Sequence, residues 1–353
     1  RSAADGRVHS TVCVTAQHRQ MLDQVLAIFG IVPDYDLDLM TERQTIPEVN
    51  ARVLLQMTPV LQQVRPDLML VHGDTTTGMA AAMAAFYQGV PVGHVEAGLR
   101  TPDIRIPFPE EMNRRVIDTL ATLYFAPTDI SRQALAREGK TAGVVVTGNT
   151  VVDALLFVRD RVRHLPEPSW YPPFRDKRII LVTAHRRESW DGGLANIALA
   201  LRQIADEFPD TAVLFPIHKN PVVREAMGPI LGDHPRIALI EPLDYEAFVQ
   251  AMTLSHLILT DSGGIQEEAP SLGLPVLVMR DVTERAEGIA AGCLQLVGTE
   301  PAGIVAAARE LLGNPGAYAA MARAGNPYGD GRATERTINA IRAWLVGGVA
   351  ALR

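Results

Sequence analysis

The stretch LILTDSGGIQEEAPSLGLPVLVMR, from Leu257 to Arg280, contains a strand, a turn, a helix and a second strand in succession. An apolar run leads into the turn Asp261-Ser-Gly-Gly, a helical segment starts near Ile265, and a second apolar run starts at Pro275. Continuous apolar strands that alternate with helices are typical of parallel sheets covered on both faces. The stretch therefore predicts a βαβ unit of an α/β protein.

The same rhythm extends over most of the 353 residues. Ala- and Leu-rich helical patterns, such as residues 19–30 and 75–89, lie between short apolar runs. The predicted strands are residues 11–16, 67–72, 91–96, 122–127, 143–148, 178–185, 211–218, 236–241, 256–262, 275–280 and 293–298. The tail from Arg332 is predicted to be a helix with no strand after it.

A cluster of prolines divides the predicted strands into two groups. Pro166, Pro168, Pro172 and Pro173 forbid regular structure and stiffen a linker. The length suits two domains of ordinary size. We expect one Rossmann-like domain over residues 1–168 and a second, nucleotide-binding one over residues 169–332.

Composition excludes several classes of protein. Lys and Arg total 33 against 40 Asp and Glu, a net charge of −7, whereas a general nucleic-acid binder usually has a basic surplus. No apolar stretch approaches the roughly 18 residues of a membrane helix, and no GxxxxGK[ST] or GxGxxG motif occurs. Cys13 and Cys293 are too few for a Cys-rich zinc site. We expect no metal, redox cofactor, nucleic acid or membrane partner.

Polar and ionisable residues follow nearly every predicted strand. Ligands of open parallel sheets bind beyond the carboxyl ends of the strands. The alternative is that strand ends are polar simply because they reach the surface. Because polar residues follow nearly all of the predicted strands in both halves, we favour a cleft lined from both domains.

The turn Ser262-Gly263-Gly264 at a helix start is suited to an anion, because glycines let backbone N–H groups approach it closely and the helix dipole favours negative charge. A diphosphate fits this description, and Glu268, one helical turn further on, could reach neighbouring hydroxyls. The alternative is a tight turn with an N-cap residue.

Four further residues are candidates for proton transfer: Asp74, Glu96, Glu110 and His185. Asp74, Glu96 and His185 follow predicted strands, and Glu110 opens a helix with Glu111. The alternatives are helix capping for Asp74, a dipole partner for one residue of the Glu110–Glu111 pair, and a structural histidine. We expect only one of that glutamate pair to face a ligand.

Several motifs together resemble one enzyme family. They are HGDTTT (72–77), GHVEAGLRT (93–101), PFPEEMNR (107–114), TGNTVVDAL (147–155), VTAHRRES (182–189), IHKNP (217–221), TDSGGIQEEAPSLGLPVLVMR (260–280) and TERAE (283–287). This combination resembles the bacterial non-hydrolysing UDP-N-acetylglucosamine 2-epimerases, from Thr11 to the C-terminal helix.

The resemblance implies a GT-B fold, with two Rossmann-like domains, a cleft between them, and the C-terminal helix 333–353 packing back on the first domain. It also implies a cytoplasmic homodimer that feeds cell-surface polysaccharide biosynthesis. Members of the family open with a further strand and a glycine-containing loop ahead of the segment matched by Thr11, so one βα unit of the expected fold is missing from the sequence.

The resemblance also implies residue roles. The diphosphate would lie on Ser262, Gly263 and Gly264, with Glu268 on the ribose, Arg285 on the nucleotide sugar and Phe248 lining the uracil pocket. Asp74, Glu96, Glu110 and His185 would surround the sugar.

A second, activating UDP-N-acetylglucosamine would contact Gln17, Gln20 and Arg43, with His18 close by. Leu243 stands where relatives would have Gln, so one contact to the base is expected to be absent.

The implied reaction reverses the configuration at C2 of the sugar. UDP leaves C1 with a proton from C2, giving a 2-acetamidoglucal, and adds back with C2 protonated from the opposite face. This requires an acid and a base on different faces, and donors for the departing diphosphate. The alternatives are a hydrolysing 2-epimerase that releases UDP and N-acetylmannosamine, a GT-B glycosyltransferase, and an impaired nucleotide-sugar-binding relic.

Overall fold

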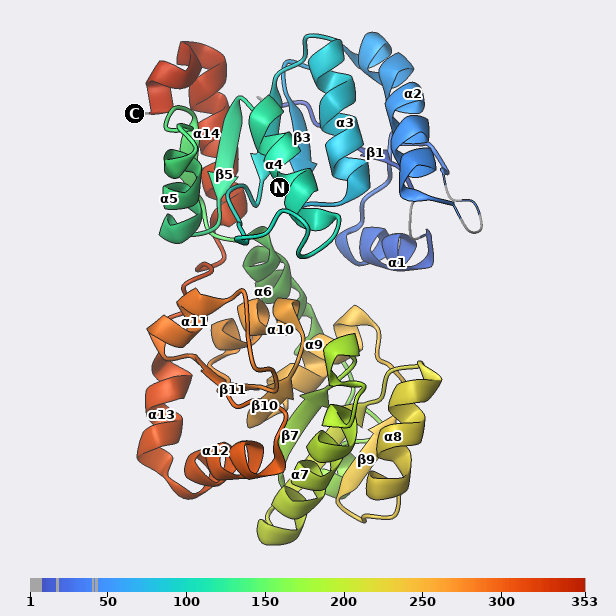
Figure 1. The fold of residues 1–353 in the computed structure, drawn as a ribbon, viewed down its shortest axis with the longest axis vertical. Helices are drawn as coiled ribbons and strands as arrows, with labels where there is room; N and C mark the ends of the chain where they lie inside the picture. Colours follow the sequence, from blue (N-terminus) through green and yellow to red (C-terminus); the bar gives the residue numbers. More distant parts are fainter. Residues whose placement is uncertain (1–7, 17–18, 40, 42–43, 353) are drawn as a thin grey trace. The chain divides into compact units, whose positions relative to one another are not determined.

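The computed structural model describes residues 8–16, 19–39, 41 and 44–352. Its chain forms two compact units, the first comprising Arg1–Thr150 with Gly331–Arg353 and the second Val151–Asp330 (Figure 1). Within these described ranges, no helix is both long enough and apolar enough to span a membrane.

The first unit has a four-stranded parallel sheet of order β3-β4-β5-β6 and a separate parallel pair, β1-β2. Its elements in chain order are β1 (Cys13–Val14), α1 (Arg19–Phe29), β2 (Tyr35–Asp36), α2 (Ile46–Val64), β3 (Met69–His72), α3 (Thr76–Tyr87), β4 (Val92–Val95), α4 (Glu110–Leu120), β5 (Leu123–Ala126), α5 (Asp129–Arg137), β6 (Val144–Val146), α14 (Ala333–Gly347) and η4 (Gly348–Leu352).

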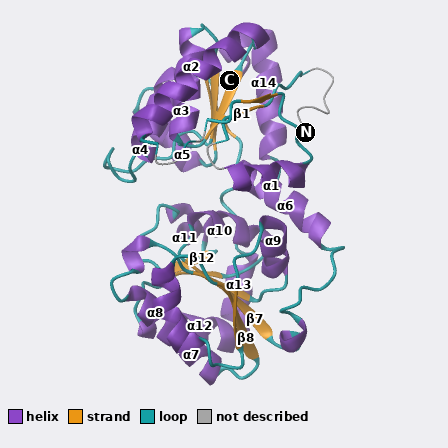
Figure 2. Cartoon of the chain, turned by 90° about the vertical axis from the view of Figure 1, so that its right-hand side faces the viewer, coloured by secondary structure: helices purple, strands orange, loops and turns teal. Residues whose placement is uncertain are grey.

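The second unit has a six-stranded parallel sheet of order β12-β11-β10-β7-β8-β9, with helices on both sides (Figure 2). Its elements are α6 (Thr150–Val162), η1 (Pro172–Phe174), β7 (Arg178–Thr183), η2 (Arg187–Ser189), α7 (Gly193–Glu207), β8 (Thr211–Pro216), α8 (Pro221–Leu231), β9 (Ile237–Ile240), α9 (Tyr245–Thr253), β10 (Leu257–Thr260), α10 (Gly263–Glu268), η3 (Ala269–Leu272), β11 (Val276–Val278), α11 (Ala286–Ala291), β12 (Leu294–Leu296), α12 (Pro301–Gly313) and α13 (Pro315–Arg323).

The chain passes from the first unit to the second before the proline cluster. It does so after Thr150, whereas the sequence predicted a boundary after residue 168. The reason lies in α6, which is grouped with the second unit: Arg161 pairs with Glu246 of α9, and the carbonyl of Pro166 accepts from Gln250. The prolines mark where regular structure stops, but the intervening helix already contacts the second unit.

The C-terminal helix α14 is grouped with the first unit. Its Ala340 and Ile341 are buried in a cluster with Leu123 and Phe125 of β5, and α14 lies beside β5 in Figure 1. The Arg336 guanidinium also donates to the carbonyl of Thr147, just after β6. Together these contacts cover one face of the four-stranded sheet.

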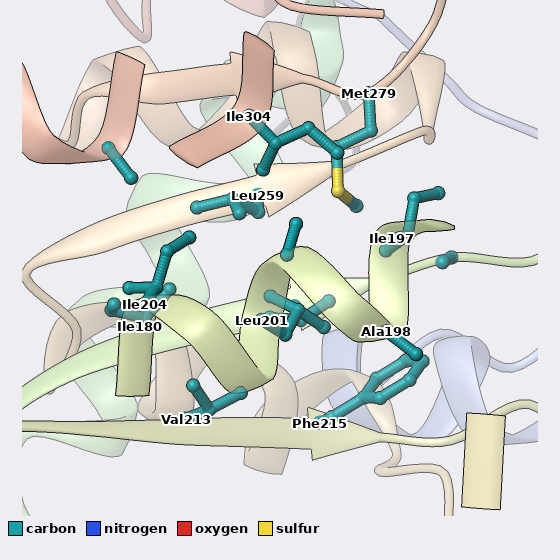
Figure 3. Close-up of a cluster of buried hydrophobic side chains, with 14 of the residues drawn as sticks. Ile180, Ile197, Ala198, Leu201, Ile204, Val213, Phe215, Leu259, Met279 and Ile304 are labelled. Atoms are coloured by element: carbon teal, nitrogen blue, oxygen red, sulfur yellow. The ribbon is translucent and has the colours of Figure 1, made fainter. Parts of the chain in front are cut away.

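The core of the second unit explains why the middles of its central strands are apolar. Ile180, Val213 and Leu259 from three neighbouring strands are inaccessible to solvent and pack with Leu201 and Ile204 of α7 (Figure 3). Burying one such side chain stabilises the fold by roughly 1.5–3 kcal/mol. Strands covered on both faces leave room for polar groups only at their ends.

A cavity of about 700 Å³ lies between the two sheets of the first unit. Its lining includes Cys13 of β1, Leu70 of β3, Leu61 of α2 and Ile341 of α14. Among the described strands, β1 and β3 do not pair with each other, so the sheet of this unit is interrupted at this cavity. The strand expected ahead of residue 11 stays a prediction.

Gly98, which follows β4, packs closely against α5, and this packing can be tested by mutation. Its φ is +87°, and a Cβ there would lie 2.4 Å from the carbonyl oxygen of Ser131 and 2.9 Å from Cγ of Leu135. Gly139 has a similar φ of +78°, but a Cβ there would meet nothing within 4 Å. Gly98→Ala should therefore lower the free energy of unfolding by about 1–3 kcal/mol more than Gly139→Ala. Urea unfolding of both variants measures the difference, and equal losses would contradict the packing.

Candidate active site

The first carboxylate of the predicted site, Asp74, lies directly after β3. Its Oδ2 accepts from Nη1 of Arg114 at 2.8 Å, and its carbonyl accepts from Nδ2 of Asn113 at 2.8 Å. Both partners come from α4, so this helix holds the backbone and the side chain of Asp74 together. A carboxylate fixed in this way is suited to meet a substrate proton in one defined direction.

Glu96 lies after the neighbouring strand β4, with its backbone in the left-handed region at φ +71°. A non-glycine residue adopts this conformation only where its surroundings enforce it, often at functional sites. Its Oε1 accepts from Asn149 at 3.3 Å, and its Oε2 lies 3.5 Å from Nε2 of His72. A Cβ on Gly73 would lie 3.2 Å from the same Oε2. The carboxylate of Glu96 therefore adjoins the turn that carries Asp74.

The two glutamates that open α4 differ in their partners. Glu111 is fully buried and accepts from the backbone N–H of Thr101 and from the guanidinium groups of Arg114 and Arg115. Glu110 is half-buried, and its Oε2 has no hydrogen-bond partner within the described part of the chain. Glu111 is thus committed to the fold, whereas Glu110 retains an acceptor for a ligand.

His185 follows β7 in the second unit, and a buried carboxylate lies beside it. Nδ1 of His185 lies 3.0 Å from Oδ1 of Asp261, which follows β10. The other oxygen of Asp261 accepts from the backbone N–H groups of His185 and Arg186, at 2.6 and 2.7 Å. Burial opposes the charge of Asp261, but His185 and the backbone donors outweigh it and lower its pKa. With Nδ1 beside Asp261, Nε2 is the nitrogen left for a substrate.

The turn Ser262-Gly263-Gly264 starts α10. A Cβ on Gly263 would lie 3.1 Å from Cζ of Arg285, so the missing side chain lets the guanidinium lie against the turn. A Cβ on Gly264 would meet nothing within 4 Å. Nε of Arg285 is held at 2.9 Å by Oε1 of Glu267. A cation beside open backbone is an arrangement that suits an anion.

Glu268, at the end of α10, is buried against α9. Tyr245 donates to its Oε1 at 2.7 Å. Burial raises the pKa of Glu268 from 4.5 to about 7; the Tyr245 hydrogen bond opposes this rise and the charge of Glu267 adds to it. Phe248 lies in α9 one turn after Tyr245 and is half-buried, and Leu243 precedes the same helix.

The predicted activator site falls largely outside the described residues. This applies to Gln17, His18 and Arg43. Gln20 belongs to α1, and nothing is described of its side chain. The activator role of these four residues stays a prediction.

The structure adds residues that the sequence patterns did not single out as functional. The sequence places Asp261 in the turn before the helix and assigns no role to Arg114 or Tyr245. Their roles depend on contacts across 76, 40 and 23 positions of the chain, respectively. The sequence could have revealed Asp261, because it follows the end of a buried strand, as Asp74 does.

The chemistry available to these groups is proton transfer and anion binding. The first unit supplies carboxylates, and the second supplies an oriented histidine and a cationic turn. Within the described ranges, no three His, Cys, Asp or Glu side chains are grouped so as to hold a metal ion.

Two Rossmann-like units, each with its polar site beyond the carboxyl ends of parallel strands, define a GT-B protein. The chain belongs to the UDP-N-acetylglucosamine 2-epimerase family, whose model matches residues 1–342. It is 52% identical to UDP-N-acetylglucosamine 2-epimerase of Escherichia coli K12 over 96% of this chain and 92% of that one. For the Bacillus subtilis enzyme of the same name, the identity is 51% over 94% and 87%.

Solved structures agree with this assignment. The UDP-GlcNAc 2-epimerase of Neisseria meningitidis, bound to UDP-GlcNAc, superimposes with a TM-score of 0.87 at 44% identity, covering 97% of this chain and 94% of that one. A trehalose-phosphate synthase from Burkholderia vietnamiensis is similar in fold alone, with a TM-score of 0.59 at 13% identity over 94% of this chain and 87% of that one. The predicted family and the predicted α/β GT-B fold are confirmed.

The raised pKa of Glu268 predicts a pH-dependent stability. The folded chain keeps this proton up to a pH of about 7, whereas the unfolded chain loses it near 4.5. The folded state therefore binds more protons between these values, and its stability should fall as pH rises through this window, by a few kcal/mol at most. Glu268→Gln should remove this part of the fall.

Urea unfolding at several pH values measures the effect. Glu225→Gln is the matched control, because Glu225 is an exposed carboxylate of α8 in the same unit. Tyr245→Phe removes the opposing hydrogen bond and should extend the fall to higher pH. Identical pH profiles for wild type and Glu268→Gln would contradict the assignment.

Proposed function

We propose that this chain is a non-hydrolysing UDP-N-acetylglucosamine 2-epimerase, which interconverts UDP-N-acetylglucosamine and UDP-N-acetylmannosamine. The observation that carries the proposal is the division of chemistry between the two units. Proton acceptors lie on one unit, and an anion-binding turn with an oriented histidine lies on the other. An elimination that expels a diphosphate while a C–H proton is removed requires both.

The nucleotide is assigned to the second unit. The diphosphate binds at Ser262, Gly263 and Gly264 beside Arg285, where backbone N–H groups and the guanidinium neutralise the charge that develops on departure. Glu268 binds the ribose hydroxyls, and Phe248 lines the uracil pocket. Leu243 supplies no polar contact to the base.

Proton transfer is assigned to Asp74, Glu96 and Glu110, with His185 assisting the diphosphate or transferring a proton. One group removes the C2 proton as the C1–O bond to UDP breaks, which leaves a C1–C2 double bond. UDP then re-forms its bond to C1, while an acid on the other face protonates C2. Arg114 and Asn113 hold Asp74 in one orientation, so it suits the role of base.

We further propose that the protein is a homodimer, and that a second UDP-N-acetylglucosamine binds beside the active site as an activator. Both proposals rest on the family resemblance.

Incubation with UDP-N-acetylglucosamine in D₂O tests the reaction. We expect deuterium at C2 in a mixture of both UDP-linked sugars, followed by NMR. Free N-acetylmannosamine would indicate a hydrolysing enzyme instead. Bound but unchanged substrate would indicate a nucleotide-sugar-binding relic, and sugar transfer to an added acceptor would indicate a glycosyltransferase.

Asp74→Asn should lower the rate of C2 exchange by at least about 10²-fold, because the amide cannot accept the proton. Asp129→Asn is the matched control, since Asp129 also lies near a helix start and pairs with an arginine, Arg132, at 2.9 Å, but on the surface. Wild-type exchange by Asp74→Asn would exclude Asp74 as a proton-handling group.

A further inference from the structure

His94 is a histidine buried within a strand, and the proposed reaction leaves it without a role. It lies in the middle of β4, fully inaccessible to solvent, with its Cα paired to Val71 of β3 and Tyr124 of β5. Its sequence neighbours in the strand are apolar or glycine. A polar ring at such a position must satisfy both nitrogens within the protein.

Both ring nitrogens of His94 have partners that accept hydrogen bonds. Nδ1 lies 2.6 Å from Oδ1 of Asp118, and Nε2 lies 2.8 Å from the carbonyl oxygen of Gly73. A carbonyl oxygen can only accept a hydrogen bond, so Nε2 of His94 carries the proton that is donated to Gly73.

Asp118 belongs to a network of side chains that continues away from His94. Its second oxygen accepts from Arg100 at 2.7 Å, and Arg100 in turn donates to both oxygens of Glu138. Arg100 and Lys140 hold the pKa of Glu138 at about 2. The network fixes the Asp118 carboxylate, which lies against Nδ1 of His94 and fixes the ring.

The carbonyl that His94 holds belongs to the turn of the active site. Gly73 has φ +67°, and its N–H donates to the carbonyl of Val95, the last residue of β4, directly before Glu96. The peptide that follows Gly73 leads directly into Asp74. With one side of Gly73 held by β4 and its carbonyl held by the ring, the direction in which Asp74 leaves the sheet is fixed from inside the core.

We propose that His94 is a positioning residue, which fixes the Gly73–Asp74 peptide through Nε2 and thereby aims the Asp74 carboxylate at the substrate. The proposal rests on the proposed function, because it concerns a carboxylate that handles the C2 proton. His94 touches no substrate itself.

The proton on Nε2 has a direct test. In ¹⁵N-histidine-labelled protein, Nε2 of His94 should carry a proton protected from exchange with solvent, identified by its loss in His94→Gln. An Nε2 without a proton would overturn the contact with Gly73.

The positioning role has a kinetic test. A Gln side chain can donate to Gly73 or face Asp118 but cannot donate to both, so His94→Gln should lower kcat on the order of 10²-fold, as expected when a catalytic group is misplaced. KM should change less than threefold, because the nucleotide is held by the other unit. Unchanged kcat, or a loss confined to KM, would overturn the proposal.

Tyr124→Phe is the matched control for disturbance of the same core. The Tyr124 hydroxyl donates to the carbonyls of Asp118 and Ala121 and makes no contact with Gly73. This variant should keep kcat within threefold of wild type, and thermal unfolding should show all variants folded at the assay temperature. A loss of kcat in Tyr124→Phe equal to that in His94→Gln would overturn the specific link to Gly73.

The two hypotheses fail in different ways. If wild type does not exchange the C2 hydrogen, the proposed function fails, whatever His94 does. If wild type exchanges it and His94→Gln does so equally fast, only the positioning role fails.

Discussion

The constraint on which the rest of the structure depends is the burial of parallel strands on both faces. Between Arg178 at the start of β7 and the paired hydroxyls of Thr183 and Thr260 at the strand ends, the side chains of β7 and β10 are apolar. The first ionisable groups beyond their carboxyl ends are His185 and Asp261. Because parallel strands end at the same edge, these two residues meet although 76 positions separate them. The site is therefore a consequence of how the core is covered.

Charges that enter such a core need fixed partners, since an isolated buried charge is strongly unfavourable. In the first unit, Arg114 links Asp74 to the buried Glu111. A second network runs from His94 through Asp118 and Arg100 to Glu138. Both networks include α4, through Arg114 and Asp118, so this helix sets the geometry of the strand exits. Arg114 thus belongs both to the ion pairs that stabilise the core and to the contacts that hold the candidate site residue Asp74.

All eleven predicted strands are present, each of them as long as or shorter than its apolar run. Periodicity and apolar content are local properties, so the sequence alone reveals them. The predicted boundary after residue 168 differs from the one after Thr150 because α6 packs with the second unit. The sequence of a helix does not show which domain the helix packs against. Glu110 and Glu111 differ in burial, and which glutamate is buried follows only from Thr101, Arg114 and Arg115; which of the two faces a ligand stays a prediction.

Asp261 and Glu268 show how one short segment sets two carboxyl groups to different states. Both are buried, and burial alone raises the pKa of each. Asp261 accepts two backbone N–H groups and faces His185, so it stays ionised. Glu268 has the hydroxyl of Tyr245 and the nearby charge of Glu267, so its pKa stays near 7. The number of hydrogen-bond donors, rather than the depth of burial, therefore distinguishes the two groups. Asp261 stays an anion that orients His185. Glu268 is a carboxyl group that can both donate hydrogen bonds to hydroxyls and accept them near neutral pH.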